Sequence, residues 1–221
     1  MSYLTQCGIL LKKHDPDRFF LSLFAPADMQ SAFWALGMFN HEIAKTREVV
    51  TSSTMGLIRL QWWRDAFTRW YEKGIATKHE VLDELLLAIE KYKLPYDLFE
   101  KLLVAREQDL HDEIADIENY ARDTSAPLFE LYSVILAHAR ISENRAQDSR
   151  FCGDDVERLA TSYALVGLAR TGQYKGAINT QKQKFKSRYF RAVQAFVELY
   201  TQAPQKIPKF KELRVWAGSF L

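Results

Sequence analysis

The stretch MGLIRLQWWRDAFTRWYEKG, from Met55 to Gly74, decides the fold class of this chain. Large apolar side chains recur along it at spacings of three, four and three, which is one face of an α-helix: Leu60, Trp63, Phe67 and Trp70. The serine and threonine cluster at 51–54 is typical of a helix N-cap, and Gly74 suits the position just after a helix. We therefore predict a helix over about 55–73.

Working outward, the rest of the chain shows the same helical periodicity between short polar turns. Strand signals are scarce, and no Asn-Gly or Asp-Gly hairpin turn occurs. Asp28 is expected to cap the helix that follows it. No linker or internal repeat divides the sequence, so we predict one all-α domain over residues 1–221, built as a large helical bundle. Further helices are predicted over about 2–13, 19–24, 28–49, 79–92, 96–110, 116–122, 126–139, 154–171 and 185–202.

Composition narrows the class of protein. Of 221 residues, 48% are hydrophobic, which is enough for a sizeable core. The 30 basic residues nearly balance 28 acidic ones, so no nucleic-acid partner is expected. Cys7 and Cys152 lie far apart and indicate neither a disulfide framework nor a zinc site. No apolar run reaches the roughly 20 residues of a membrane span, and the first residues resemble neither a signal nor a transit peptide, so a cytoplasmic location is expected.

Two features are candidate sites from the residues alone. Trp62 and Trp63 point about 100° apart on their helix, so we expect one to anchor the bundle and the other to line a cavity or seam. A helix over 106–116 would place four carboxylates on one stripe, and the spacing of two of them suits Mg²⁺ ions that hold a diphosphate. A solvated acidic face explains the same spacing, and is the more frequent case. The four are Asp109, Asp112, Glu113 and Asp116.

Several longer segments resemble the squalene/phytoene synthase family. They are HDPDRFFLSLFAPADMQSAFWALGMFNHEIAKTREVV (14–50), MGLIRLQWWRDAF (55–67), REQDL (106–110), ENYARDTSAPLFELYSVILA (118–137) and ATSYALVGLARTG (160–172). The resemblance covers about 13–172, and its most specific part is RLQWWRDA. It implies an all-α isoprenoid-synthase fold. The enzymes of that family join two prenyl diphosphates head to head. In that family two Asp-rich motifs hold the Mg²⁺ ions that draw off diphosphate.

Neither motif is present at the positions where the resemblance puts it. The first should fall on 44–48, which reads AKTRE and has one acid, Glu48. Lys45 and Arg47 there would repel a metal ion. The second should fall on 171–175, which reads TGQYK and has no acid. The chain also lacks a Tyr-Leu-Pro element of the family, and is expected to be short toward the C-terminus.

The resemblance is therefore to the non-catalytic branch of the family, which includes a mitochondrial assembly factor for respiratory complex I. It implies a pseudoenzyme without a cofactor that acts as a binding or assembly protein, and a peripheral position at an inner membrane is compatible with that role. Two alternatives stay open: an active prenyltransferase with Mg²⁺ on Asp112 and Asp116, and a protein that keeps the cavity for an isoprenoid or other lipid. The cavity or ligand-binding candidates are His41, Lys45, Arg47, Glu48, Arg59, Trp62, Arg64, Tyr163 and Arg170.

One basic segment could also contact anionic lipid. Its cations are Lys182, Lys184, Lys186, Arg188 and Arg191, and its aromatic residues Phe185, Tyr189 and Phe190 would enter the membrane interface. A solvated helix with a buried aromatic stripe is the alternative.

Overall fold

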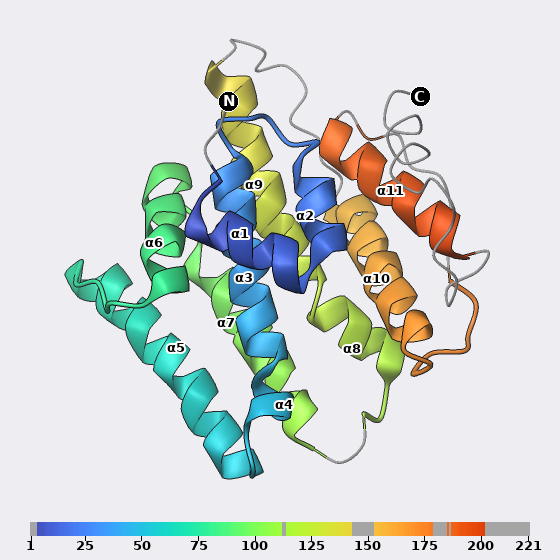
Figure 1. Cartoon of the computed structure of the whole chain (residues 1–221), viewed down its shortest axis with the longest axis horizontal. Helices are drawn as coiled ribbons and strands as arrows, with labels where there is room; N and C mark the ends of the chain where they lie inside the picture. Colours follow the sequence, from blue (N-terminus) through green and yellow to red (C-terminus); the bar gives the residue numbers. More distant parts are fainter. Residues whose placement is uncertain (1–3, 112–113, 143–152, 179–184, 186, 202–221) are drawn as a thin grey trace.

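The computed structural model describes residues 4–111, 114–142, 153–178, 185 and 187–201, and every regular element among them is a helix (Figure 1). The predicted all-α class is confirmed. The helices are α1 (Gln6–His14), α2 (Pro16–Ser22), α3 (Gln30–Ala44), α4 (Thr46–Val49), α5 (Ser53–Lys73), α6 (Glu80–Tyr92), α7 (Tyr96–Glu107), the 3₁₀ turn η1 (Gln108–Leu110), α8 (Ile117–Asp123), α9 (Ala126–Ser142), α10 (Gly153–Arg170) and α11 (Arg188–Thr201). None of the helices in this part of the chain combines the length and apolar composition that a bilayer crossing requires.

Helix α3 is the centre of the bundle. Its nine consecutive residues 32–40 are all buried, so the helix has no solvent-facing side over more than two turns. It packs against α1, α2, α6, α7 and α9, which surround it in Figure 1. One continuous core runs from Cys7 to Tyr200 around it.

Two glycines let α1 and α3 approach closely. A Cβ on Gly8 would lie 2.7 Å from the Trp34 ring, and a Cβ on Gly37 would lie 2.9 Å from a methyl of Leu11. Both distances are well below the van der Waals separation of two carbon atoms. The two glycines thus set how near α1 lies to the central helix.

Helix α5 forms as its sequence predicts. The Ser52 hydroxyl accepts the Met55 N–H as the N-cap, and Gly74 ends the helix in the left-handed conformation, with φ of 65°. Trp63 is 2% exposed and packs edge-to-face on Phe39, whereas Trp62 is 36% exposed. One tryptophan anchors the bundle and the other does not, as the sequence predicted.

The predicted helix over 28–49 is wrong at both ends. Its N-cap is Met29, which makes no side-chain cap hydrogen bond, so Asp28 lies one position too early to cap it. The Asp28 carbonyl instead accepts hydrogen bonds from Lys91 and Tyr92 of α6. The helix ends at Ala44, and α4 follows as a separate turn.

The acidic stripe predicted on a helix over 106–116 is also wrong. The backbone leaves the 3₁₀ turn at His111, which is extended, and Asp116 is the N-cap of α8. Its carboxylate accepts the N–H groups of Glu118 and Asn119, a local arrangement that competes with a continuing helix. Asp112 and Glu113 lie outside the described residues. Asp109 and Asp116 therefore do not share one helical face.

Helix α11 buries the aromatic residues that were candidates for membrane insertion. Phe185, Tyr189 and Phe190 are 8%, 2% and 0% exposed and belong to the core. The alternative, a helix with a buried aromatic stripe, is confirmed for these residues: Tyr189 packs on Phe33 of α3 and Tyr132 of α9, and Phe190 packs on Phe129 of α9. Lys182, Lys184 and Lys186 lie outside the described residues.

Candidate functional site

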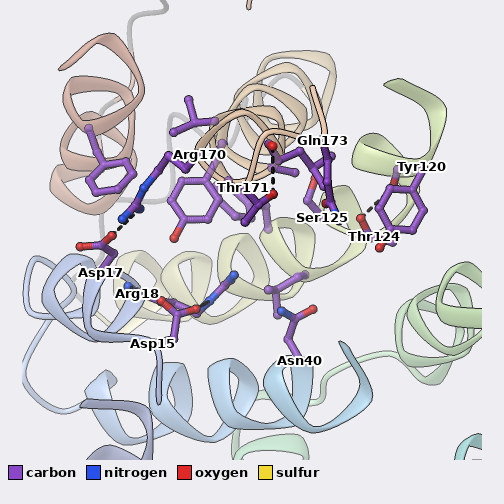
Figure 2. A pocket seen from close by; sticks show the side chains of 18 of the residues that line it. Asp15, Asp17, Arg18, Asn40, Tyr120, Thr124, Ser125, Arg170, Thr171 and Gln173 are labelled. Carbon is purple, nitrogen blue, oxygen red and sulfur yellow. Dashed lines mark hydrogen bonds and ion pairs between the residues drawn. The ribbon is translucent and has the colours of Figure 1, made fainter. Parts of the chain in front are cut away.

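A cavity of about 320 Å³ lies between the start of α2, the middle of α3, the end of α7, the α8–α9 turn and helices α10 and α11. Figure 2 shows its labelled side chains converging from several of these elements. Its size is at the lower end of the range for small-molecule sites.

The first wall comes from the DPDR sequence at 15–18. Asp15 caps α2, Pro16 takes the first helical position, and the Asp15 carboxylate accepts both the backbone N–H and the Nε–H of Arg18, the latter at 2.9 Å. Burial by itself would raise the pKa of Asp15, but the Arg18 guanidinium outweighs it and holds that pKa below its usual value. The Arg18 guanidinium carbon lies 5.4 Å from the centre of the Tyr163 ring.

A second ion pair closes the cavity between α2 and the end of α10. Arg170 donates to Asp17 at 2.7 Å, and its guanidinium stacks over the Tyr200 ring at 4.7 Å. The two partners are 153 residues apart in sequence. This pair is drawn in Figure 2.

A third group of polar side chains lies where the end of α7 borders the cavity. Arg106 donates to the Tyr120 hydroxyl at 2.9 Å, and that hydroxyl donates to Asp109 at 2.5 Å. Burial raises the pKa of Tyr120 to about 12, so its proton stays in this bond at neutral pH. The Arg106 side chain is 11% exposed, and its Nε–H has no hydrogen-bond partner among the described residues.

The central helix contributes one polar side chain, Asn40. The residue is 6% exposed, and its Oδ1 has no hydrogen-bond partner in the described part of the chain. In Figure 2 Asn40 rises from α3, and Thr171 and Gln173 come from the opposite side. A buried carbonyl oxygen without a donor costs about 1–3 kcal/mol, so a further donor that reached this atom would be stabilising.

The second expected acidic motif does fall at this cavity. Thr171 and Gln173 line it, and both are uncharged. The first motif position, 44–48, lies at the end of α3 and in α4, and its one acid, Glu48, is exposed. The carboxylates that do line the cavity, Asp15 and Asp17, are each bonded to an arginine. These residues do not fit a cluster of Mg²⁺ ions, which needs several free carboxylate oxygens.

The other potential metal ligands of the described residues do not form a metal site either. No three or more His, Cys, Asp or Glu side chains in that part of the chain are placed to hold one metal ion.

The sequence candidates are spread over four places. Tyr163 and Arg170 line the cavity. Arg59 and Trp62 line a second, more open cavity of about 490 Å³ beside α5. Arg64 is in neither cavity: it donates to Glu100 at 2.8 Å and to Glu107 at 2.6 Å, and so joins α5 to α7.

The four remaining candidates lie where α3 gives way to α4. His41 stacks on His14 with ring centres 5.1 Å apart, and its Nε2 is buried without a partner among the described residues. Lys45 joins the two helices, and Arg47 and Glu48 are exposed on α4. The structure therefore does not gather the nine candidates into one site.

Sequence reasoning missed most of the polar residues that line the cavity. Asp15 and Arg18 lie between the helices predicted over 2–13 and 19–24, where two acids and an arginine around a proline are an unusual density of charge. Asn40 is one polar residue in a nine-residue buried run, which is a usable signal because buried polar groups need partners. The ion pairs themselves could not be found, since their partners come from distant helices.

Comparison with known proteins agrees with the fold. Residues 11–203 match the family model for squalene/phytoene synthase. The proteins named NADH dehydrogenase (ubiquinone) complex I, assembly factor 6, from Bos taurus and Homo sapiens are each 33% identical over 175 residues, which is 77% of this chain and 50% of theirs. A Drosophila melanogaster homolog of that factor is 25% identical over 169 residues, 73% of this chain and 51% of its own. The chain spans about half the length of these relatives. With a family match over most of its length and an all-helical bundle around the cavity, the chain belongs to the squalene/phytoene synthase family.

Proposed function

We propose that this chain is a non-catalytic member of its family and acts as an assembly protein for respiratory complex I. The observation that carries the proposal is the pair Thr171 and Gln173, uncharged side chains that line the cavity where the family's second acidic motif is expected. The names of the mammalian relatives, which are 33% identical, support the assembly role.

Loss of catalysis would follow from the absence of a metal ion beside the diphosphate leaving group. Release of diphosphate from a prenyl chain develops negative charge that Mg²⁺ neutralises, and carboxylates must hold the metal. Asp15 and Asp17 are already neutralised by Arg18 and Arg170. A metal ion would have to displace both arginines, and their positive charges would then lie beside it.

The assembly role is tested in cells from which the gene for this chain has been removed. We expect mature complex I to be depleted on native gels and NADH:ubiquinone reductase activity to fall, with other respiratory complexes unchanged. Re-expression of the full chain should restore both. Normal complex I in the deletion strain would refute the role.

A second function is favoured by the cavity itself. We propose that it holds an isoprenoid or another lipid without reacting with it, because apolar side chains of α9, α10 and α11 line it opposite the polar groups: Leu128, Phe129, Val166 and Phe196. Native mass spectrometry of the protein purified gently from cells should detect a bound small molecule. A protein that is always empty would count against this function.

We also propose that the exposed side of α5 makes a peripheral contact with a membrane surface. Met55, Ile58 and Trp62 are 53%, 59% and 36% exposed and lie on one side of the helix. Tryptophan favours the membrane–water interface. Flotation with liposomes should recover the wild-type chain with the lipid, and Ile58→Asp should stay at the bottom; equal recovery of the two would refute this surface.

A further inference from the structure

The charged side chains of the 320 Å³ cavity are already paired with one another or with a neighbouring carboxylate. Three arginines reach it, and each is bonded to a carboxylate: Arg18 to Asp15, Arg170 to Asp17 and Arg106 to Asp109. An anionic ligand would have to compete with these aspartates for the guanidinium groups. The cavity thus offers little net charge to a diphosphate, in contrast to a site built on free cations or metal ions.

Two buried side-chain atoms of the lining residues have no hydrogen-bond partner in the part of the chain that the structure describes, one of them an acceptor and the other a donor. Asn40 Oδ1 is an acceptor, and Arg106 Nε–H is a donor, and both are buried without partners among the described residues. Both residues line the same cavity. The hydroxyls of Thr124 and Ser125, also in the lining, already donate to the backbone carbonyls of Tyr120 and Ala121, so only their lone pairs remain.

A ligand that completes this set must both donate and accept. A hydroxyl group has both functions, because its hydrogen can be donated to an amide oxygen such as Asn40 Oδ1 and its oxygen can accept from a guanidinium N–H such as that of Arg106. A diphosphate fully ionised at neutral pH has acceptors only, so it would leave Asn40 Oδ1 unpaired and place negative charge near Asp15 and Asp17. The apolar residues of α9 and α11 can cover a hydrocarbon chain next to the hydroxyl.

We propose that this cavity binds a neutral, hydroxyl-bearing amphiphile of the prenyl-alcohol type, without metal, through Asn40 and Arg106. The specificity for diphosphate is replaced by specificity for an uncharged polar head. This inference rests on the proposal that the cavity holds a lipid, and is independent of the assembly role.

The first test compares matched ligands on the full chain by isothermal titration calorimetry. Geraniol and farnesol are titrated against geranyl and farnesyl diphosphate, each with and without Mg²⁺ and at two salt concentrations. We expect the alcohols to bind with affinities that change less than twofold with Mg²⁺ or salt, and the diphosphates to bind at least tenfold more weakly. Tighter, Mg²⁺-dependent binding of the diphosphates would overturn the inference and leave a lipid-holding cavity. Binding of none of the four would overturn both.

The second test uses two buried polar atoms of the same kind. Asn40→Leu removes the unpaired acceptor from the cavity, whereas Thr46→Val removes an unpaired hydroxyl that is 1% exposed and lies outside the cavity lining. Both variants should melt at or above the wild-type temperature, because each removes an unsatisfied polar group. Asn40→Leu should weaken alcohol binding about tenfold, the size of one lost hydrogen bond, and Thr46→Val should not change it. Unchanged binding by folded Asn40→Leu would overturn the assignment.

Discussion

His41 shows how one candidate residue behaves once the chain has folded. Burial disfavours its charged form, and the His14 ring stacked on it adds to this, so the pKa of His41 lies below its usual value. Glu42 and Asp15 act in the opposite direction, and Lys45 acts in the same direction as His14. The residue therefore behaves as a neutral, partly buried ring.

This pKa predicts a pH dependence of stability. In the unfolded chain His41 titrates near 6.5, so between that pH and its lower folded value the unfolded state binds more protons. The free energy of unfolding should therefore fall as the pH is lowered from 7.5 through 6.5. Denaturant titrations should show a smaller fall for His41→Gln. The loss expected from Asp15 lies at lower pH, near and below 4, because its folded pKa is lowered.

The control for this prediction is His111→Gln, at an exposed histidine. It should keep the wild-type pH dependence. An unchanged pH dependence in His41→Gln would contradict the role given to burial of this ring.

At the scale of elements, α5 is held by packing at its start and by ion pairs along its length. A Cβ on Gly56 would overlap the Leu110 side chain of η1. Farther along, Arg64 joins α5 to two acids of α7 while its own side chain is 16% exposed. The helix that decided the fold class is thus fixed to its neighbours by residues whose partners are 36 or more positions away.

Two helical glycines should respond in opposite ways to alanine. Gly56→Ala should lower the free energy of unfolding by about 1–3 kcal/mol, because the overpacking against Leu110 exceeds the gain in helix propensity. Gly167→Ala in α10 meets nothing within 4 Å and should raise it by about 0.5–1 kcal/mol. Urea denaturation measures both. A stabilised Gly56→Ala would mean that α5 does not pack on η1 as described.

Removal of the Arg64 side chain should weaken the attachment of α5 to α7. Arg64→Ala loses two charge-assisted hydrogen bonds whose acids are about one-third exposed, so we expect a loss of about 1–2 kcal/mol in the free energy of unfolding. Lys101→Ala, which breaks an exposed pair with Asp97 at 3.7 Å, is the control and should cost less than about 0.5 kcal/mol. Equal effects of the two variants would show that the Arg64 pairs contribute no more than a surface contact.

The helices could be predicted where local signals agree with the packing. Ser52 and Gly74 bound α5 because capping and left-handed glycine act within a few residues. The same reasoning failed at Asp28, whose carboxylate is one position from the cap, and over 106–116, where Asp116 caps a new helix. In both cases an acidic residue was present, and the local backbone conformation determined whether its carboxylate caps a helix.

At the scale of the whole molecule, the family resemblance predicted one wall of the cavity, at 171–175. The residues of the other walls could not be predicted from the sequence. The segment 171–175 could be placed at a site because the family pattern marks that position, and Tyr163 and Arg170 lie nearby on α10. Asp17 and Arg18 could not, because their partners Arg170 and Tyr163 come from the other end of the chain. Arg59 and Arg64 have the right chemistry for an anion, but the fold pairs them with Glu42, Glu100 and Glu107.

The proposed loss of the family's diphosphate chemistry can be measured directly as the release of diphosphate. The purified full chain is incubated with farnesyl or geranylgeranyl diphosphate and saturating Mg²⁺, and released diphosphate is followed against a buffer blank. We predict release at the blank rate with both substrates. Mg²⁺-dependent release above the blank, lost on Asp15→Asn or Asp17→Asn, would contradict the claim and show that these carboxylates leave their arginines to bind metal.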